Sequence, residues 1–241
     1  MSFLIFRPQA KCVSSAQAFA NEGLNAVACG LIDTELDEQA LAALPQHIAQ
    51  LSTQSLVIVT STVAAEQCVL FKSMWPSQVQ FFAVGQSTAD ILNQAGLTAI
   101  VPTEARSEGL LALPMLNDVA EKTVIIIKGF GGRELLADTL TLRGAKVREW
   151  ALYKRVALAK PFCTRQWHHE QIQCIIATSG EVIAAAFNHY AASWLQTKLW
   201  IVVSERTADI AYQFGITQVQ ISDSASDQAL IKSAKAASHR P

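Results

Sequence analysis

Short apolar runs alternate along the whole chain with segments rich in Ala, Leu, Glu and Gln. Several of these runs are almost continuously apolar, which is typical of parallel strands covered on both faces. The expected strands are 3–6, 26–32, 56–60, 79–84, 98–102, 123–128, 146–153, 174–178, 199–204 and 217–221. Most segments between them end in a glycine that can serve as a helix C-cap. The alternation predicts an α/β protein with parallel sheets.

One phrase of the sequence occurs twice. VGQSTADILNQAG at 84–96 returns as VSERTADIAYQFG at 203–215, each time from the end of an expected strand. VTST at 59–62 is matched in the same way by ATSG at 177–180. Two halves of the chain therefore share one plan, in which a strand leads through Thr-Ser to a helix and the next strand leads through Thr-Ala-Asp to another.

The repeat is permuted relative to the chain order, which indicates the domain organisation. The N-terminal segment precedes the first Thr-Ser unit, so we expect it to complete the second half of the repeat. This predicts two parallel-sheet, flavodoxin-like α/β domains joined by a two-segment hinge. The expected domains and linkers are a discontinuous domain of 1–33 and 171–241, a continuous domain of 51–153, a linking helix within 34–50 and an irregular, Pro-containing linker at 154–170.

Composition and charge narrow the function classes. Hydrophobic residues make up 51% of the chain and charged residues 16%, so a sizeable core is expected and extended disorder is not. Lys+Arg 19 against Asp+Glu 20 argues against a nucleic-acid binder, which carries a basic surface. The apolar runs are too short to cross a bilayer, and MSFLIFRPQA lacks the features of a signal peptide. We expect a cytoplasmic protein that binds neither nucleic acid nor membrane.

Cysteine and histidine positions give no sign of a disulfide framework or a metal site. The five cysteines, with no C-x-x-C pair among them, are Cys12, Cys29, Cys68, Cys163 and Cys174. Such an odd, scattered set predicts reduced, buried thiols. His168 and His169 are adjacent and point in different directions, and no further ligand stands at a useful spacing.

Hydroxyl side chains stand where expected strands meet helices, in both halves of the repeat. They are Thr60, Ser61, Thr88, Thr178, Ser179 and Thr207. Open α/β sheets bind ligands at this edge, where helix N-termini offer free N–H groups to a carboxylate or phosphate. Ser and Thr are also ordinary N-caps, so a purely structural interpretation stands beside the functional one.

Three further features suit an anionic ligand, although each also has a structural explanation. KGFGGRE at 128–134 is a glycine-rich turn with Lys128, Gly129 and Arg133, but it is neither a G-x-G-x-x-G motif nor a P-loop. Arg7 ends the first strand, where it either pairs with an anion or lies on the surface. Tyr153 follows an apolar strand, where it either faces an interdomain cleft or packs into the core.

Taken in order, the motifs resemble the uroporphyrinogen-III synthase family over essentially the whole chain. The resemblance rests on the Arg-Pro opening, the Thr-Ser strand end, AVGQSTADILNQAGL, SEGLL, GFGGRELLADTLTLRGAKV followed by LYKR, and TSG followed by VVSERTADIAYQFGI. The sequence departs from the family at Val63, where the family often has Asn, and at Ser204, where the second half has lost a glycine. These departures affect the backbone contacts expected at a ligand.

The resemblance implies a lyase of tetrapyrrole (haem and sirohaem) biosynthesis. It implies that hydroxymethylbilane, a linear tetrapyrrole polycarboxylate, is cyclised with inversion of ring D and loss of water to uroporphyrinogen III, without a metal or organic cofactor. Tyr153 matches the family's cleft tyrosine, the favoured group for assisting hydroxyl departure. The expected substrate-binding residues are Arg7, Thr60, Ser61, Thr88, Lys128, Gly129, Arg133, Thr178, Ser179 and Thr207. A monomer with a transient contact to the preceding enzyme of the pathway is also expected.

Two other interpretations stay open from the sequence. The first is a non-catalytic, two-lobed cytosolic protein that binds a small anionic ligand in its interdomain cleft. The second is a nucleotide-dependent α/β enzyme that uses GFGG, against which the missing acidic residue of a proper dinucleotide motif counts.

Overall fold

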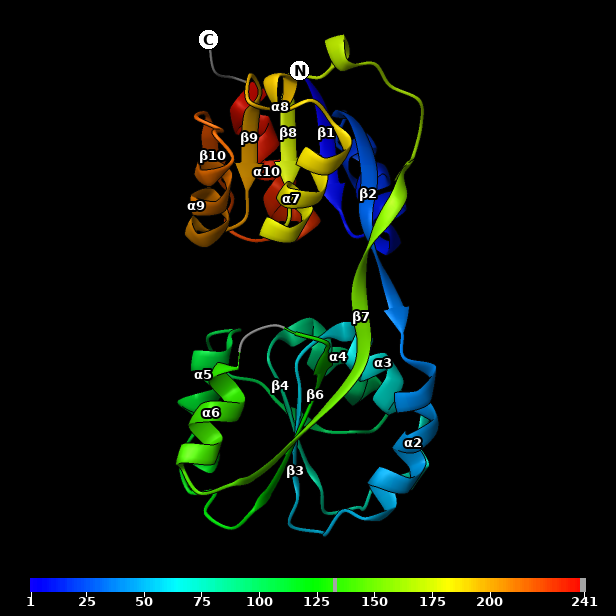
Figure 1. Ribbon diagram of the computed structural model, residues 1–241, viewed down its shortest axis with the longest axis vertical. Coiled ribbons are helices and arrows are strands. Elements are labelled where there is room, and N and C mark those ends of the chain that lie inside the picture. The colour runs from blue at the N-terminus through cyan, green and yellow to red at the C-terminus, as the bar shows by residue number, and fades with distance from the viewer. Residues whose placement is uncertain (132–133, 239–241) are drawn as a thin grey trace. The chain divides into compact units, whose positions relative to one another are not determined.

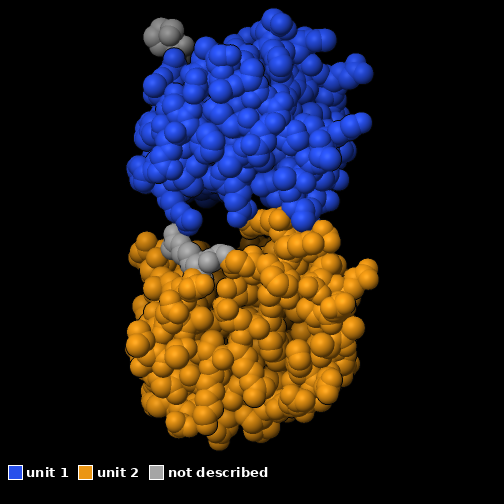
Figure 2. Space-filling view, in the orientation of Figure 1, with its two compact units in different colours: residues 1–34, 156–241 blue, residues 35–155 orange. Residues whose placement is uncertain are grey.

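The computed structural model describes residues 1–131 and 134–238. The chain divides into two compact units, which Figure 2 colours separately. Unit 1 comprises residues 1–34 and 156–241, and unit 2 comprises residues 35–155. The chain therefore passes between the units twice, and unit 1 is built from both ends of the sequence.

Unit 1 contains a parallel sheet in the strand order β10-β9-β8-β1-β2 (Figure 1). Its strands are β1 (Ser2–Arg7), β2 (Asn25–Leu36), β8 (Cys174–Ala177), β9 (Leu199–Val202) and β10 (Val219–Ile221). The central strand β1 is buried from Phe3 to Arg7. Because neighbouring strand residues point to opposite faces, Leu4 and Phe6 enter one core cluster whereas Phe3 and Ile5 enter the other.

Helices cover both faces of this sheet. They are η1 (Gln9–Lys11), α1 (Cys12–Asn21), η4 (His169–Gln171), α7 (Gly180–His189), α8 (Ala192–Leu195), α9 (Glu205–Gln213) and α10 (Asp227–Ser238). Buried residues of α7 and α9 pack around Trp200 on one face, while α1 and α10 pack against Phe3 on the other. The result is a three-layer unit in which the strands need no polar face, as their continuous apolar sequences predict.

Unit 2 repeats this architecture in the strand order β7-β6-β3-β4-β5, again with parallel neighbours. Its strands are β3 (Leu56–Val59), β4 (Gln80–Ala83), β5 (Ala99–Ile100), β6 (Thr123–Gly129) and the first part of β7 (Lys146–Cys163). Its helices are α2 (Glu38–Ala49), α3 (Thr62–Leu70), η2 (Lys72–Met74), α4 (Gln86–Gln94), α5 (Ser107–Leu111), η3 (Pro114–Leu116) and α6 (Leu135–Leu142). Helices α2, α3 and α4 pack on one face, and α5 and α6 pack on the other.

The doubled phrase of the sequence forms α4 in unit 2 and α9 in unit 1. Each helix begins after a buried strand and is followed by a glycine with positive φ, which is 88° at Gly96 and 79° at Gly215. A left-handed conformation just beyond a helix end favours glycine, so the predicted C-caps at these two positions are confirmed. All ten expected strands are also present among the described residues, which confirms the α/β fold.

The two expected linkers take other forms. Residues 38–49 do form a helix, α2, but Leu44 and Ile48 are fully buried in a core cluster of unit 2, so this helix is part of that unit. The expectation of an irregular connection after 153 is wrong, because β7 continues as a strand to Cys163.

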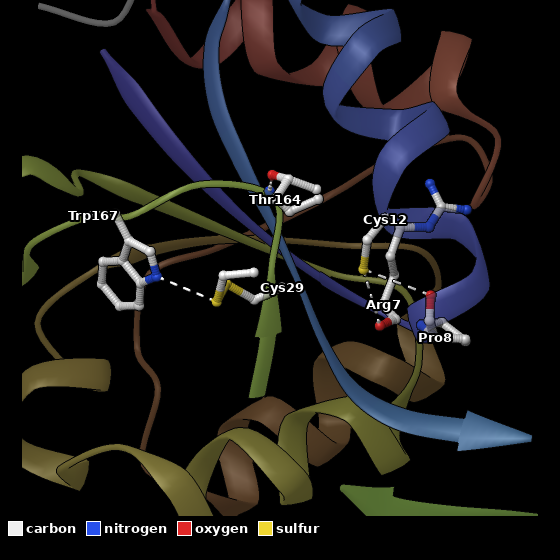
Figure 3. The surroundings of a disulfide bond; sticks show 8 residues. Arg7, Pro8, Cys12, Cys29, Thr164 and Trp167 are labelled. Atoms are coloured by element: carbon white, nitrogen blue, oxygen red, sulfur yellow. Dashed lines mark hydrogen bonds between the residues drawn. A yellow bond between two sulfur atoms is a disulfide. The ribbon is translucent and has the colours of Figure 1, made fainter. Parts of the chain in front are cut away.

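The expectation of fully reduced thiols is wrong for two of the cysteines. Cys29 in β2 and Cys163 at the end of β7 form a disulfide within unit 1 (Figure 3). Their Cα atoms are 4.2 Å apart, although 134 residues separate them in the sequence. Thr164 supports the same approach, since its N–H donates to the Ala28 carbonyl at 2.9 Å. The spacing of the cysteines in the sequence does not predict this pair, because only the fold brings the two segments together.

The other three cysteines, Cys12, Cys68 and Cys174, are reduced and buried as predicted. Burial raises the pKa of the Cys12 thiol to about 11 and that of Cys68 to about 12. Both therefore stay protonated near neutral pH, which makes them poor nucleophiles. No helix among the described residues is long and apolar enough to cross a membrane.

Candidate active site

In unit 2, the carboxyl end of β3 leads directly into α3 through Thr60 and Ser61. The Thr60 hydroxyl donates to the Ile127 carbonyl of neighbouring β6 at 3.1 Å, so it closes the sheet edge. Ser61 is the N-cap of α3, and its Oγ accepts from the N–H of Ala64 at 3.1 Å. The structural interpretation of both residues is therefore satisfied, and only Ser61 keeps a hydroxyl proton that this capping bond does not use.

Tyr153 of β7 reaches this same strand end. Its hydroxyl donates to Ser61 Oγ at 2.9 Å, and the residue is only 6% exposed within the core cluster that contains α3. The side chain is thus packed, as one alternative from the sequence held, yet its polar tip lies at the edge where ligands bind in such sheets. The two interpretations of Tyr153 do not exclude each other.

A β-bulge between the paired strands directs Tyr153 to this edge. The register of β6 and β7 shifts between Lys128, which pairs with Ala151, and Gly129, which pairs with Tyr153. The additional residue, Leu152, is buried in the same core cluster as Tyr153. Bulges redirect side chains in this way and are common beside active sites.

Gly129 provides the space that the tyrosine ring occupies. A Cβ atom at this position would lie 2.6 Å from Tyr153 Cε2 and 2.7 Å from Cζ, closer than real Cβ contacts allow. At Gly129 the structural explanation of the glycine-rich turn, close packing, is therefore confirmed, and anion binding by the turn stays a prediction. Its glycine at 129 lets the ring lie against the backbone of β6.

Two basic residues of the turn are expected to bind an anion. Lys128 is part-buried and its Nζ lies 2.7 Å from Glu149 Oε1 of β7, so an ion pair already balances its charge. Arg133 lies outside the described residues. The sequence does not predict Glu149 as the partner of Lys128, because Glu149 is only one polar position of an expected strand.

In unit 1, the carboxyl end of β8 repeats the geometry of β3. The Thr178 N–H donates to the Phe6 carbonyl at 3.3 Å, and Ser179 caps α7 by accepting from the Val182 N–H at 3.3 Å. The duplication has therefore preserved the cap in both units. The phenol that contacts Ser61 in unit 2 comes from β7, outside the repeated phrases.

The two threonines of the doubled phrase are nearly buried in the first turns of their helices. Thr88 in α4 is 4% exposed and Thr207 in α9 is 6% exposed. Thr207 Oγ1 lies 2.9 Å from the Oγ of Ser204, which also accepts the Thr207 N–H at 3.2 Å. In unit 2 a glycine, Gly85, occupies the equivalent N-cap position. The sequence departure at Ser204 thus replaces an open backbone cap with a side-chain cap.

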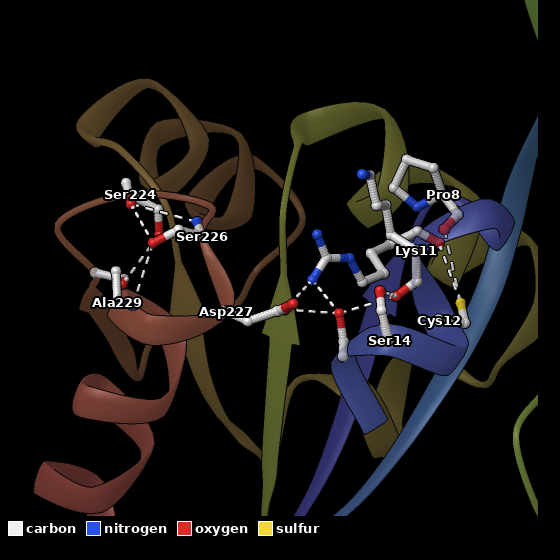
Figure 4. Close-up of polar contacts among 11 residues, drawn as sticks. Pro8, Lys11, Cys12, Ser14, Ser224, Ser226, Asp227 and Ala229 are labelled. Atoms are coloured by element: carbon white, nitrogen blue, oxygen red, sulfur yellow. Dashed lines mark hydrogen bonds and ion pairs between the residues drawn. The ribbon is translucent and has the colours of Figure 1, made fainter. Parts of the chain in front are cut away.

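Arg7, at the carboxyl end of β1, is buried and partnered within unit 1. Its Nη1 donates to Ser15 and forms an ion pair with Asp227, the first residue of α10. Ser15 Oγ donates to the same carboxylate at 2.7 Å. Figure 4 shows Asp227 pointing from the start of α10 toward α1. The Nε atom of Arg7 is buried and has no hydrogen-bond partner among the residues that the structure describes.

No group of three or more His, Cys, Asp or Glu side chains that could hold a metal ion occurs in residues 1–131 and 134–238. His169 instead lies against an aromatic ring, with its ring centroid 4.4 Å from that of Trp194. His169 thus belongs to an aromatic cluster of unit 1 that also contains Trp167, Tyr190 and Trp194.

These features define the class of the protein. It is a two-unit parallel α/β protein in which serine-capped helices begin at the carboxyl edge of each sheet, and in unit 2 a tyrosine hydroxyl contacts one of those caps. Comparisons with known proteins identify the family.

The family model described as uroporphyrinogen-III synthase HemD matches residues 14–232. The uroporphyrinogen-III synthases of Escherichia coli (strain K12) and Salmonella typhimurium (strain LT2) are each 32% identical to the chain over 244 aligned residues, covering 96% of it and 99% of the relative. The chain belongs to the uroporphyrinogen-III synthase family.

Solved structures agree at the level of the fold. A mutant uroporphyrinogen III synthase from the extremely thermophilic bacterium Thermus thermophilus matches with a TM-score of 0.61 at 14% identity, over 100% of both chains. Uroporphyrinogen-III synthetase from Helicobacter pylori 26695 matches with a TM-score of 0.64 at 13% identity, over 98% of this chain and 100% of that chain.

Proposed function

We propose that this chain catalyses the uroporphyrinogen-III synthase reaction in tetrapyrrole biosynthesis. It cyclises hydroxymethylbilane to uroporphyrinogen III, inverting ring D and releasing water. Full-length similarity to curated enzymes of that name supports the activity, and the family model covers most of the chain. A non-catalytic anion-binding protein on the same scaffold is not favoured by these relationships.

The chemistry requires control of conformation more than strong acids or bases. Loss of the hydroxyl leaves an azafulvene cation, which closes spontaneously to the I isomer when nothing directs it. Formation of the III isomer requires attack through the substituted carbon of ring D, by way of a spiro-pyrrolenine intermediate. Holding one folded conformation of the substrate therefore supplies much of the catalysis.

The observation that carries the proposal is the hydrogen bond between Tyr153 and Ser61. It places a phenol at the carboxyl end of β3, beside the N-terminus of α3. A phenol O–H is a hydrogen-bond donor near neutral pH and assists departure of a hydroxide equivalent. The helix N-terminus favours negative charge, so a substrate carboxylate fits beside the departing group.

Binding of the acetate and propionate arms is assigned to the two sheet edges. The proposed contacts in unit 2 are made by Thr60, Ser61, Thr88, Lys128 and Gly129, and those in unit 1 by Arg7, Thr178, Ser179 and Thr207. Arg7 and Lys128 already have carboxylate partners, so a substrate carboxylate competes with Asp227 and Glu149 for them. Hydroxyls and backbone amides therefore provide most of the binding free energy in this proposal, and each contributes a modest share.

The remaining proposals concern the setting of the reaction. We place the protein in the cytoplasm, acting as a monomer on a small-molecule substrate, without nucleic acid, membrane or cofactor. A transient contact with the preceding enzyme of the pathway would shorten the time in which the unstable substrate closes on its own.

The test supplies enzymatically generated hydroxymethylbilane, followed by oxidation and separation of the isomers. The proposal requires isomer III to dominate, at a rate proportional to protein concentration. Accumulation of only isomer I, at the rate of a protein-free sample, would reject synthase activity.

A further inference from the structure

The hydroxyl of Ser61 accepts two hydrogen bonds at once. Ala64 N–H donates to its Oγ at 3.1 Å, and the Tyr153 hydroxyl donates to it at 2.9 Å. A serine hydroxyl has two acceptor lone pairs and one proton. Both lone pairs are therefore engaged, and the Ser61 proton has to be donated to a group other than these two.

The difference in exposure between Ser61 and Tyr153 indicates that the Ser61 proton is the one available to a ligand. Ser61 is half-buried, whereas Tyr153 is only 6% exposed and directs its own proton at Ser61. The hydroxyl that offers its proton at the carboxyl edge of β3 is thus the serine. The phenol lies behind it.

From this geometry we infer that Ser61 delivers the proton to the departing hydroxyl of the substrate and that Tyr153 replaces it. This inference rests on the proposed synthase function and deepens it. Ser61 becomes the catalytic residue that touches the reacting atom, and Tyr153 becomes the second member of a two-proton relay.

The step balances in atoms and charge. The substrate C–O bond breaks with its electron pair on oxygen, which takes the Ser61 proton and leaves as water. Ser61 Oγ takes the Tyr153 proton, so the phenolate stands behind the serine while the azafulvene cation forms. The proton lost when the final pyrrole regains aromaticity returns through Ser61 to Tyr153, and the net reaction releases only water.

Two structural features keep the relay aligned. The capping bond from Ala64 fixes the Ser61 rotamer, since Ser61 Oγ must stay over the first turn of α3. The absence of a side chain at Gly129 lets the tyrosine ring approach, because a Cβ there would meet Tyr153 Cζ at 2.7 Å. Gly129 is in this sense a positioning residue.

The relay predicts which single substitution lowers kcat the most. Ser61→Ala removes the direct donor, so kcat for isomer III falls at least as far as in Tyr153→Phe, by roughly 10²-fold, with a smaller change in KM. The double variant is no slower than the slower single variant, because both changes interrupt one path. If Tyr153 instead donated directly, Tyr153→Phe would be the slower variant and Ser61→Ala would keep most of its turnover.

Folding controls separate this result from loss of the helix cap. Ser61→Asn keeps an N-cap of equal quality but cannot pass a proton on, so wild-type stability with lost turnover is expected. Ser61→Thr keeps both the cap and the proton, so its turnover recovers. Asp37→Ala removes the N-cap of α2 in the same unit, where Asp37 accepts from the Ala40 N–H at 2.8 Å, and turnover is expected to be unchanged.

A proton inventory counts the protons that move in the rate-limiting step, and a purely structural role of Tyr153 would not change that count. Turnover to isomer III is measured in mixtures of H₂O and D₂O for wild type and for Tyr153→Phe. The relay predicts a curved plot for wild type, from two protons in motion, and a linear plot for Tyr153→Phe. A linear wild-type plot, or full turnover in Ser61→Asn, overturns the relay while leaving synthase activity intact; absence of isomer III from the wild type rejects the function itself.

Discussion

Arg7 and Asp227 form an ion pair between the end of β1 and the start of α10, although 220 residues separate them in the sequence. The arginine side chain is 9% exposed and the aspartate side chain 30% exposed, so the pair is shielded from bulk solvent on one side. This contact ties the first strand of the chain to its last helix within unit 1. In the proposed site, a substrate carboxylate that binds Arg7 has to compete with Asp227.

Asp227→Asn is expected to lower the stability of the protein and to tighten substrate binding. The buried guanidinium loses its counter-charge, which costs about 1–3 kcal/mol in the free energy of unfolding. The same change removes a negative charge that competes with substrate carboxylates, so KM falls. Urea denaturation and steady-state kinetics measure the two effects.

Lys232→Gln is the matched control in the same helix. It breaks the Lys232–Asp223 ion pair, whose side chains are 76% and 73% exposed. An exposed pair contributes little, so no measurable change in the urea midpoint is expected. Equal midpoints for the Asp227 and Lys232 variants would contradict the structural role of the Arg7 pair.

Gly129→Ala is expected to displace the tyrosine ring and to reduce turnover. The new methyl group would lie 2.6 Å from Tyr153 Cε2, and the ring cannot yield without losing its hydrogen bond to Ser61. A displacement of this kind lowers kcat by roughly 10- to 100-fold. Gly85→Ala is the control, since its methyl would contact Ala105 Cβ at an ordinary 3.5 Å. A Gly129→Ala variant with wild-type kcat would show that the ring position is unimportant.

The Cys29–Cys163 disulfide is expected to stabilise unit 1. It closes a loop across 134 residues of sequence, and a native disulfide typically contributes about 2–4 kcal/mol to the free energy of unfolding. In the oxidised protein, alkylation after unfolding labels only Cys12, Cys68 and Cys174, and reduction exposes all five thiols. Labelling of five thiols without reductant, or an unfolding midpoint insensitive to reductant, would contradict the pairing.

Tyr190 is expected to make stability fall at high pH. Burial raises the pKa of its hydroxyl from 10.0 to about 12, so the folded state keeps this proton more firmly than the unfolded chain does. Its contribution is therefore complete below pH 10 and is lost as the pH rises toward 12. Urea midpoints measured across this range should fall more steeply for wild type than for Tyr190→Phe. Tyr212→Phe, at a position 54% exposed, is the control and should follow wild type.

The fold could be predicted from the sequence because its information is local. Buried parallel strands read as continuous apolar runs, and the glycines at 96 and 215 mark helix ends by their backbone conformation. The segments that connect the two units are harder to predict from the sequence. Helix α2 looked like a linker because its buried face, Leu44 and Ile48, cannot be distinguished by sequence from that of any amphipathic helix.

The sequence predicts the residues of the candidate site that stand at strand ends. It does not predict the ion pairs that their neighbours form. Thr60, Ser61 and Tyr153 stand out because hydroxyls at strand ends form a recognisable pattern. Asp227 and Glu149 gave no such signal, since an acidic residue at a helix start or on a strand is usually exposed. Long-range partners of this kind depend on the completed fold, as does the disulfide of Cys29.

The chemistry assigned to the carboxyl edge of β3 is tested most directly by turnover and product binding in Tyr153→Phe. The measurement compares the rate of isomer III formation from hydroxymethylbilane with the Kd of uroporphyrinogen III for the wild type and the variant. The expected result is a loss of roughly 10²-fold in kcat with a Kd within a few-fold of wild type, because the phenol replaces the proton that Ser61 delivers to the departing hydroxyl. An unchanged kcat would contradict any role of Tyr153 in proton delivery.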